Sequence, residues 1–154
     1  MSGDDYKTMT TADIRGDFLR FFAGKGCALY PSSPLVPEDP SLLLTNAGMN
    51  QFKEYYQGLK TMREIGACSC QKCLRTNDIE NIGDSSHLSF FEMLGNWSLG
   101  DYFKKEQITW MWTFLTEEVG LDPNRLYVTC FIGAPEYNIA KDTEAAELWR
   151  QKFA

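Results

Sequence analysis

The chain has little positive charge and no long apolar run. Its 154 residues include 15 Lys and Arg against 21 Asp and Glu, which gives a formal net charge of −6. Free-standing nucleic-acid-binding domains usually carry a basic face, so this balance argues mildly against RNA binding by this chain alone. The apolar runs are too short to cross a bilayer, which argues against a membrane protein.

A secretion signal and an even set of cysteines are also missing. The first residues, Met1 to Asp5, are polar and acidic, and the five cysteines are an odd number. Free thiols are typical of a reducing compartment. We therefore expect a cytoplasmic protein.

A glycine-rich phosphate-binding loop is absent as well. The sequence has no GxxxxGK[ST] motif, and Gly95 and Gly100 do not complete a GxGxxG turn that opens a helix. A protein without such a loop can still bind ATP if an arginine holds a phosphate and an aromatic ring stacks on the adenine. Arginines and aromatic rings are therefore the candidate residues for a nucleotide site.

Helical periodicity is clear in several segments. Thr10 and Asp13 form the pattern of a capping box before an apolar stripe. Asp101 is expected to cap a long amphipathic helix that ends before Gly120, and Thr143 to begin the last helix. The expected helices cover about residues 11–24, 51–58, 102–119 and 143 onward.

Strand-like runs lie between these helices. The expected strands cover about residues 27–30, 42–45, 67–75, 88–97 and 126–131. Four prolines within residues 31–40 predict an irregular connector. The polar residues 76–86 predict a long loop that joins two strands into a hairpin. This order favours an α+β fold, with helices packed on a mixed, mainly antiparallel sheet.

The hairpin brings together side chains that could hold a nucleotide. Arg75 ends the first strand and His87 precedes the second, so both flank the loop. Strand alternation puts Phe90 and Phe91 on opposite faces of the sheet. Aromatic pairs in strands usually belong to the core, but here one ring is expected to remain available to a ligand.

Metal binding is a second interpretation of the same region. The CxCxxC run over residues 68–73, together with His87, has the composition of a Cys₃His zinc site, although the spacing is atypical. Asn77 and Asp78, with Glu80, are candidate ligands for magnesium beside a nucleotide, although polar loop tips commonly have this composition. A small zinc-binding interaction domain therefore stays open as an alternative.

Three blocks of the sequence carry a more specific pattern. Residues 71–83, QKCLRTNDIENIG, are followed by residues 90–103, FFEMLGNWSLGDYF. Upstream lie TNAGMNQFK at 45–53 and FLRFF at 18–22 with a following Lys-Gly pair. These blocks resemble the alanyl-tRNA synthetases of class II, and the hairpin block resembles their motif 2. The resemblance covers about residues 10–131 and keeps the order of the family.

The resemblance implies a function and a set of site residues. The family activates alanine with ATP and Mg²⁺ and then esterifies tRNA(Ala). By motif position, Arg75 would bind the ATP α-phosphate and the alanine carboxylate, and His87 the distal phosphates. Phe91 would stack on the adenine, and Glu92 would lie near its edge. A fixed guanidinium suits this reaction, because negative charge grows on the phosphate oxygens in the transition state.

Two departures from the family pattern limit this interpretation. The loop after Arg75 is shorter than in many relatives, so a lysine contact from this loop to ATP or to the tRNA end is lost or replaced. No counterpart of motif 3 follows, so residues 10–154 would be the N-terminal portion of a catalytic domain, after a flexible tail at residues 1–9. An incomplete sheet leaves an exposed edge, which predicts self-association. The alternative is a truncated, non-catalytic paralogue that binds a nucleotide or a partner.

Overall fold

A computed structural model describes residues 8–76 and 79–153 of the chain. The chain divides into two compact units, one over Arg15–Asp101 and the other over Tyr102–Ala154 together with the segment up to Ile14. Helices combine with a three-stranded mixed sheet, which confirms the predicted α+β class. The expected tail at residues 1–9 lies outside the described residues except for Thr8 and Met9.

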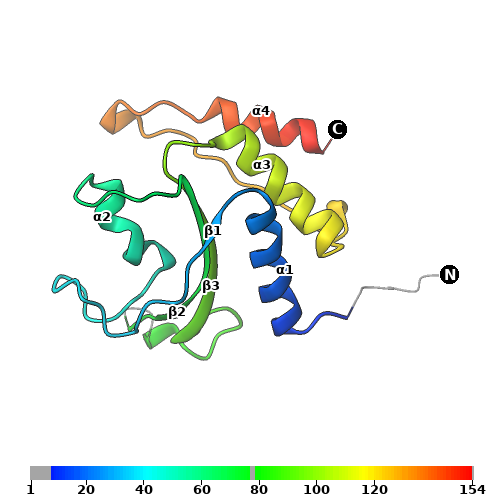
Figure 1. The fold of residues 1–154 in the computed structure, drawn as a ribbon. Helices are drawn as coiled ribbons and strands as arrows, with labels where there is room; N and C mark the ends of the chain where they lie inside the picture. Colours follow the sequence, from blue (N-terminus) through cyan, green and yellow to red (C-terminus); the bar gives the residue numbers. More distant parts are fainter. Residues whose placement is uncertain (1–7, 77–78, 154) are drawn as a thin grey trace. The chain divides into compact units, whose positions relative to one another are not determined.

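The sheet belongs to the Arg15–Asp101 unit and has the order β1–β2–β3 (Figure 1). The short strand β1 (Ala28–Leu29) runs parallel to β2 (Gly66–Leu74), which pairs antiparallel with β3 (Phe90–Ser98). Every residue of β2 has a partner in β3. The predicted hairpin is therefore confirmed, and its loop contains a short 3₁₀ helix at Ile79–Asn81.

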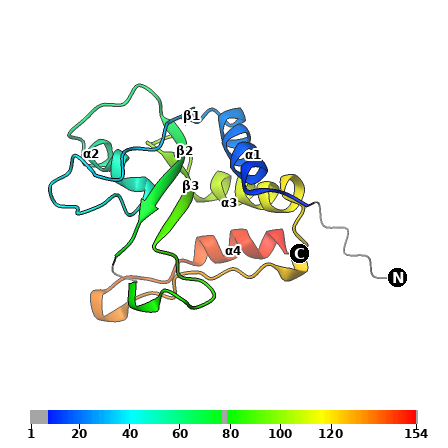
Figure 2. The same ribbon diagram turned by 90° about the horizontal axis from the view of Figure 1, so that it is seen from below.

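Each face of this sheet has its own cover. Helix α1 (Thr11–Gly24) begins with the predicted capping box, because Asp13 Oδ2 accepts from the Thr10 N–H at 2.8 Å and the Asp13 N–H donates to Thr10 Oγ1 at 3.2 Å. From Arg15 onward, α1 covers one face (Figure 1). The 3₁₀ helix Gly48–Phe52 and helix α2 (Lys53–Tyr56) lie on the other face (Figure 2).

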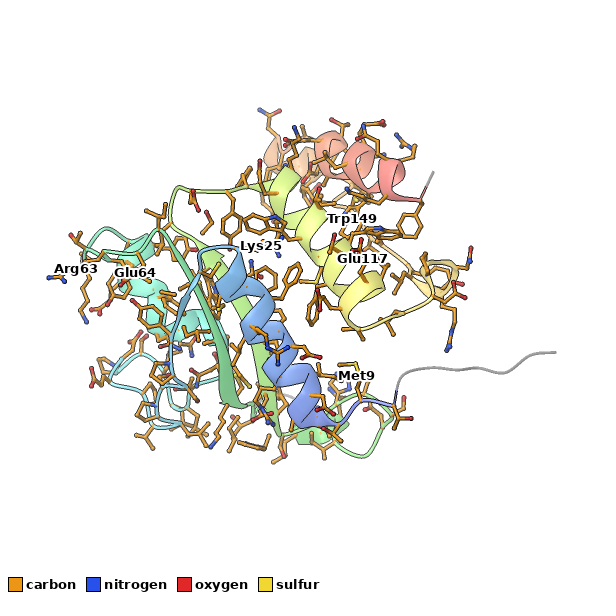
Figure 3. All side chains as sticks on the ribbon, turned by 45° about the vertical axis from the view of Figure 1, so that its right-hand side comes forward. Met9, Lys25, Arg63, Glu64, Glu117 and Trp149 are labelled. Atoms are coloured by element: carbon orange, nitrogen blue, oxygen red, sulfur yellow. The ribbon has the colours of Figure 1, made fainter. Side chains whose placement is uncertain are left out.

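Aromatic side chains build much of the core on both sides of the sheet. Phe18 and Phe22 of α1 are buried with ring centroids 4.6 Å apart, and Phe52 packs on Trp97 at 4.5 Å. At the end of α1, Lys25 holds its Nζ 5.0 Å from the Phe21 ring centroid (Figure 3). The sheet is thus a central layer between two apolar covers.

The second unit consists mainly of two packed helices. Helix α3 (Lys104–Thr113) continues into a π-helical turn at Phe114–Glu118, and α4 (Thr143–Lys152) packs on it through rings of Trp112 and Phe153 that lie 4.9 Å apart. Asp101 does not cap α3 as predicted. The helix begins later, where the Glu106 carboxylate accepts from the Phe103 N–H at 3.3 Å. None of the described helices is long and apolar enough to span a bilayer.

Two predicted strands do not form in the described part of the chain. Leu43 is 81% exposed, and within residues 42–45 only the Thr45 carbonyl meets the sheet, where it accepts from the Leu74 N–H at 2.9 Å. Residues 126–131 form neither helix nor strand, and Tyr127 is 92% exposed. An apolar run becomes a strand only where a neighbouring strand takes up its backbone hydrogen bonds.

Candidate functional site

The two faces of the β2–β3 ladder carry different side chains. Residues paired directly across the ladder share a face. We call the side covered by residues 31–58 the connector face; it carries Ala67, Ser69, Gln71 and Cys73 of β2 with Phe91, Met93, Gly95 and Trp97 of β3. The side covered by α1 is the helix face, and it carries Cys68, Cys70, Lys72 and Leu74 with Phe90, Glu92, Leu94 and Asn96.

Arg75 lies at the loop end of the hairpin and turns onto the connector face. Its N–H extends the ladder by donating to the Ser89 carbonyl at 2.9 Å. Its Cζ lies 5.2 Å from the centroid of the Phe91 ring, and its Nε donates to the Asn46 carbonyl at 3.1 Å. No carboxylate of a described residue lies within ion-pair distance of this guanidinium. The Arg75–Phe91 patch therefore presents a cation and a flat ring side by side.

Phe90 and Phe91 are separated by strand alternation, as predicted. Phe91 is opposite Cys73 and shares the face of Arg75, whereas Phe90 is opposite Leu74 on the helix face. The structure thus identifies which of the two rings accompanies the arginine.

Glu92 is not brought together with Arg75. It lies on the helix face, where its Oε2 accepts from Arg15 Nη2 at 2.6 Å and from Arg15 Nε at 3.1 Å. The hydrogen bond to Glu92 raises the pKa of the Arg15 guanidinium. The adenine contact expected of Glu92 therefore has no support in the position of its side chain.

His87 lies in the exposed loop before β3 and is held by Asp84. Its Nδ1 is 2.5 Å from Asp84 Oδ2, and Asp84 Oδ1 accepts from the N–H groups of His87 and Ser86. These hydrogen bonds, led by the His87 N–H, lower the pKa of Asp84 to about 2. Asp84 is not among the site residues predicted from the sequence, although an aspartate three residues before a histidine is a recognisable signal. Asn77 and Asp78 lie outside the described residues.

The cysteines do not converge on a zinc site. Cys68 and Cys70 are on the helix face and Cys73 is on the connector face. Burial raises the pKa of the Cys68 thiol to about 12, whereas zinc binds the thiolate. Among the described side chains no group of three metal-ligating residues is close enough to hold an ion, so they fit neither the zinc alternative nor a preformed magnesium site.

Gln71 joins residues 32 and 33 to β2, a role that is not predicted from the sequence. Its side chain is fully buried, and its Oε1 accepts from the Ser33 N–H at 2.9 Å and from Gln51 Nε2 at 3.1 Å. Its Nε2 donates to Ser32 Oγ at 3.1 Å and to the Ser33 carbonyl at 3.0 Å. A glutamine at a buried strand position is the signal that could have revealed it.

Two glycines on this side make room for the Trp97 ring. A Cβ atom on Gly95 would lie 2.3 Å from a ring atom of Trp97, and one on Gly48 would lie 2.9 Å from the same ring. Gly95 sits inside β3, so close packing rather than a turn explains its small size.

A cavity of about 580 Å³ is lined by residues of the segments 33–45 and 50–60. Neither Arg75 nor Phe91 lines it, and both of its lysines are paired with carboxylates. Lys53 Nζ lies 2.8 Å from Asp39 Oδ2, and Lys60 Nζ lies 2.5 Å from Glu54 Oε2. An anionic ligand therefore finds a better partner in Arg75 than in this cavity.

The chain is similar to known proteins over nearly its whole length. The family model described as tRNA synthetases class II (A) matches residues 13–154. The alanine–tRNA ligase of Rubrobacter xylanophilus is 52% identical over 144 residues, which cover 93% of this chain and 16% of that protein. The alanine–tRNA ligase of Cytophaga hutchinsonii is 50% identical over 152 residues, which cover 95% and 17%.

A third relative gives the same result. The alanine–tRNA ligase of Thermus thermophilus is 53% identical over 148 residues, which cover 92% of this chain and 16% of the relative. This chain thus spans about a sixth of the length of the curated relatives it matches. The family match over residues 13–154 shows that the chain belongs to the class II (A) family of tRNA synthetases.

Proposed function

We propose that this chain forms part of the ATP site of an alanine–tRNA ligase. The observation that carries the proposal is the Arg75 guanidinium held over the Phe91 ring on one face of the hairpin. Membership in the family and similarity to alanine–tRNA ligases support alanine as the amino acid and tRNA(Ala) as the acceptor. A cytoplasmic location is part of the same proposal.

The Arg75–Phe91 patch suits the activation of alanine by ATP, which is the first half of the ligase reaction. A carboxylate oxygen of alanine attacks the α-phosphorus of ATP, and the bond to the bridging oxygen breaks and releases pyrophosphate. Negative charge grows on the α-phosphate oxygens, where the Arg75 guanidinium would stabilise it. Phe91 would stack on the adenine. Carboxyl activation by this route requires no covalent intermediate with the protein.

The loop residues have supporting roles in the proposal. His87, held by Asp84, would contact the distal phosphates of ATP. Mg²⁺ would neutralise phosphate charge when it arrives with the nucleotide, since the described residues offer no carboxylate cluster to hold it alone. Glu92 receives no role at the adenine, because it is paired with Arg15 on the opposite face.

Alanine-dependent exchange of pyrophosphate into ATP tests the activity, and calorimetric titration with ATP tests the site. We expect ATP to bind the wild-type chain and the Arg75→Gln variant to bind it about tenfold or more weakly, because a charge-assisted contact is lost. Unchanged ATP affinity in the Arg75→Gln variant would contradict the proposal. ATP binding without any exchange would instead favour the non-catalytic paralogue.

Self-association through an exposed sheet edge remains a prediction. β1 and β3 are the outer strands of the described sheet, and outer strands present unpaired backbone groups. Sedimentation velocity over a range of concentrations should show dimers or larger species. A single monomeric species at every concentration would count against this prediction.

A further inference from the structure

The backbone carbonyls of residues 45 and 46, two neighbours in the segment that covers the connector face, accept hydrogen bonds from the end of β2 and from Arg75. The Leu74 N–H donates to the Thr45 carbonyl at 2.9 Å, and the Nε of Arg75 donates to the Asn46 carbonyl at 3.1 Å. The first bond fixes the strand backbone and the second fixes the side chain that follows it. The position of the guanidinium therefore depends on where residues 45 and 46 lie.

Thr45 is itself fixed by every polar group it has. It is 1% exposed, its N–H donates to the Leu35 carbonyl at 2.8 Å, and its Oγ1 donates to the Pro34 carbonyl at 2.7 Å. Together with the hydrogen bond from the Leu74 N–H, these contacts join residues 34 and 35 to β2 through the buried Thr45. A displacement of the Asn46 carbonyl would have to break or bend at least one of them.

The way in which Arg75 is held leaves its phosphate-binding atoms available. The Asn46 carbonyl accepts from Nε, and the Cζ lies 5.2 Å from the centroid of the Phe91 ring. Neither contact uses the two Nη nitrogens, which are the donors that grip a phosphate in a fork. An arginine fixed before the ligand arrives also loses less side-chain entropy on binding.

We propose that Thr45 is a positioning residue for the nucleotide, because its buried hydrogen bonds place the Asn46 carbonyl that holds Arg75 over Phe91. The inference rests on the proposed ATP role of the Arg75–Phe91 patch. Thr45 touches no ligand and acts through Arg75.

Paired substitutions at Thr45 test the inference. Thr45→Val keeps the shape and removes the hydroxyl donor, whereas Thr45→Ser keeps the hydroxyl. We expect Thr45→Val to weaken ATP binding about five- to tenfold with adenosine binding unchanged, because adenosine lacks phosphates and uses Phe91 alone. Thr45→Ser should restore the wild-type ratio of the two affinities. A Thr45→Val protein that melts earlier but keeps this ratio would overturn the inference.

Nitrogen NMR of the arginine side chains gives a readout that needs no ligand. The Nε–H of Arg75 should exchange with water slowly in the wild-type chain and faster in Thr45→Val. The Nε–H of Arg15, which is bonded to Glu92 at 3.1 Å, is the matched control and should not change. Wild-type exchange at Arg75 as fast as in a solvated arginine would overturn the inference even if Thr45→Val does not fold.

A double-mutant cycle separates this inference from the proposed function. In an Arg75→Gln background, Thr45→Val should have no further effect on ATP affinity. If Arg75→Gln alone leaves ATP affinity unchanged, the proposed site is wrong. If Arg75→Gln weakens ATP but Thr45→Val adds the same loss in both backgrounds, only the positioning role is wrong.

Discussion

The two faces of the β2–β3 ladder each hold an arginine, and they hold it in different ways. On the helix face, Arg15 Nη2 lies 2.6 Å from the Glu92 carboxylate. On the connector face, Arg75 has a backbone carbonyl and an aromatic ring as its contacts. A carboxylate neutralises a guanidinium, whereas a carbonyl and a ring orient it and leave its charge in place. The arginine on the helix face thus joins α1 to β3, whereas the arginine on the connector face keeps its charge available for an anion.

The largest expected effect comes from removing each arginine in turn. Arg75→Gln should lower alanine-dependent pyrophosphate exchange by about 100-fold or more, the usual cost of losing one donor that stabilises transition-state charge. Arg15→Gln removes an equal charge from the other face and should change the exchange rate less than about threefold, since a partly exposed ion pair contributes little. Equal losses of exchange activity in the two variants would contradict the different roles assigned to the two arginines.

Packing against Trp97 gives the next effect. Gly95→Ala would place a methyl group 2.3 Å from the indole, so the ring or the strand must move. We expect a loss of about 1–3 kcal/mol in the free energy of unfolding, measured in urea. The control is Gly24→Ala at the end of α1, where nothing lies within 4 Å of the added carbon. A Gly95→Ala protein as stable as wild type would show that the connector face is loosely packed.

Phe91 and Phe90 lie on opposite faces of the ladder, so replacing each in turn tests which face binds the adenine. Phe91→Leu should weaken adenosine and ATP binding about tenfold, because stacking of a base on an aromatic ring contributes about 1–3 kcal/mol. Phe90→Leu, one residue away on the helix face, should leave both affinities near wild type. Isothermal titration with adenosine and with ATP measures the difference, and a larger loss for Phe90→Leu would reverse the assignment of the faces.

A smaller effect distinguishes two buried polar residues on the connector face. Gln71 has hydrogen-bond partners for both polar atoms of its side chain, whereas the buried Ser69 Oγ has none among the described residues. Ser69→Ala should therefore raise the free energy of unfolding by about 1 kcal/mol, since an unsatisfied hydroxyl is removed. Gln71→Met should lower it. Destabilisation by Ser69→Ala would mean that the hydroxyl has a partner after all.

Local patterns were enough to predict some of these features. The alternation of Phe90 and Phe91 follows from the period of a strand, and the cap of α1 follows from Thr10 and Asp13. The pairing of Glu92 with Arg15 joins residues 77 positions apart, and no local pattern reports it. Residues 126–131 have the composition of a strand, but a strand also needs a neighbour that composition does not supply.

The pairing of β2 with β3 also determines how far the loop after Arg75 can vary in length. Nine residues of β2 are paired with β3, and packing on both faces fixes their register. Closing a flexible loop costs only about 0.6 kcal/mol more for each doubling of its length. Residues can therefore be inserted or deleted between Thr76 and His87 while Arg75 and Phe91 keep their spacing. The loop can diverge in length and sequence while the geometry of the patch stays the same.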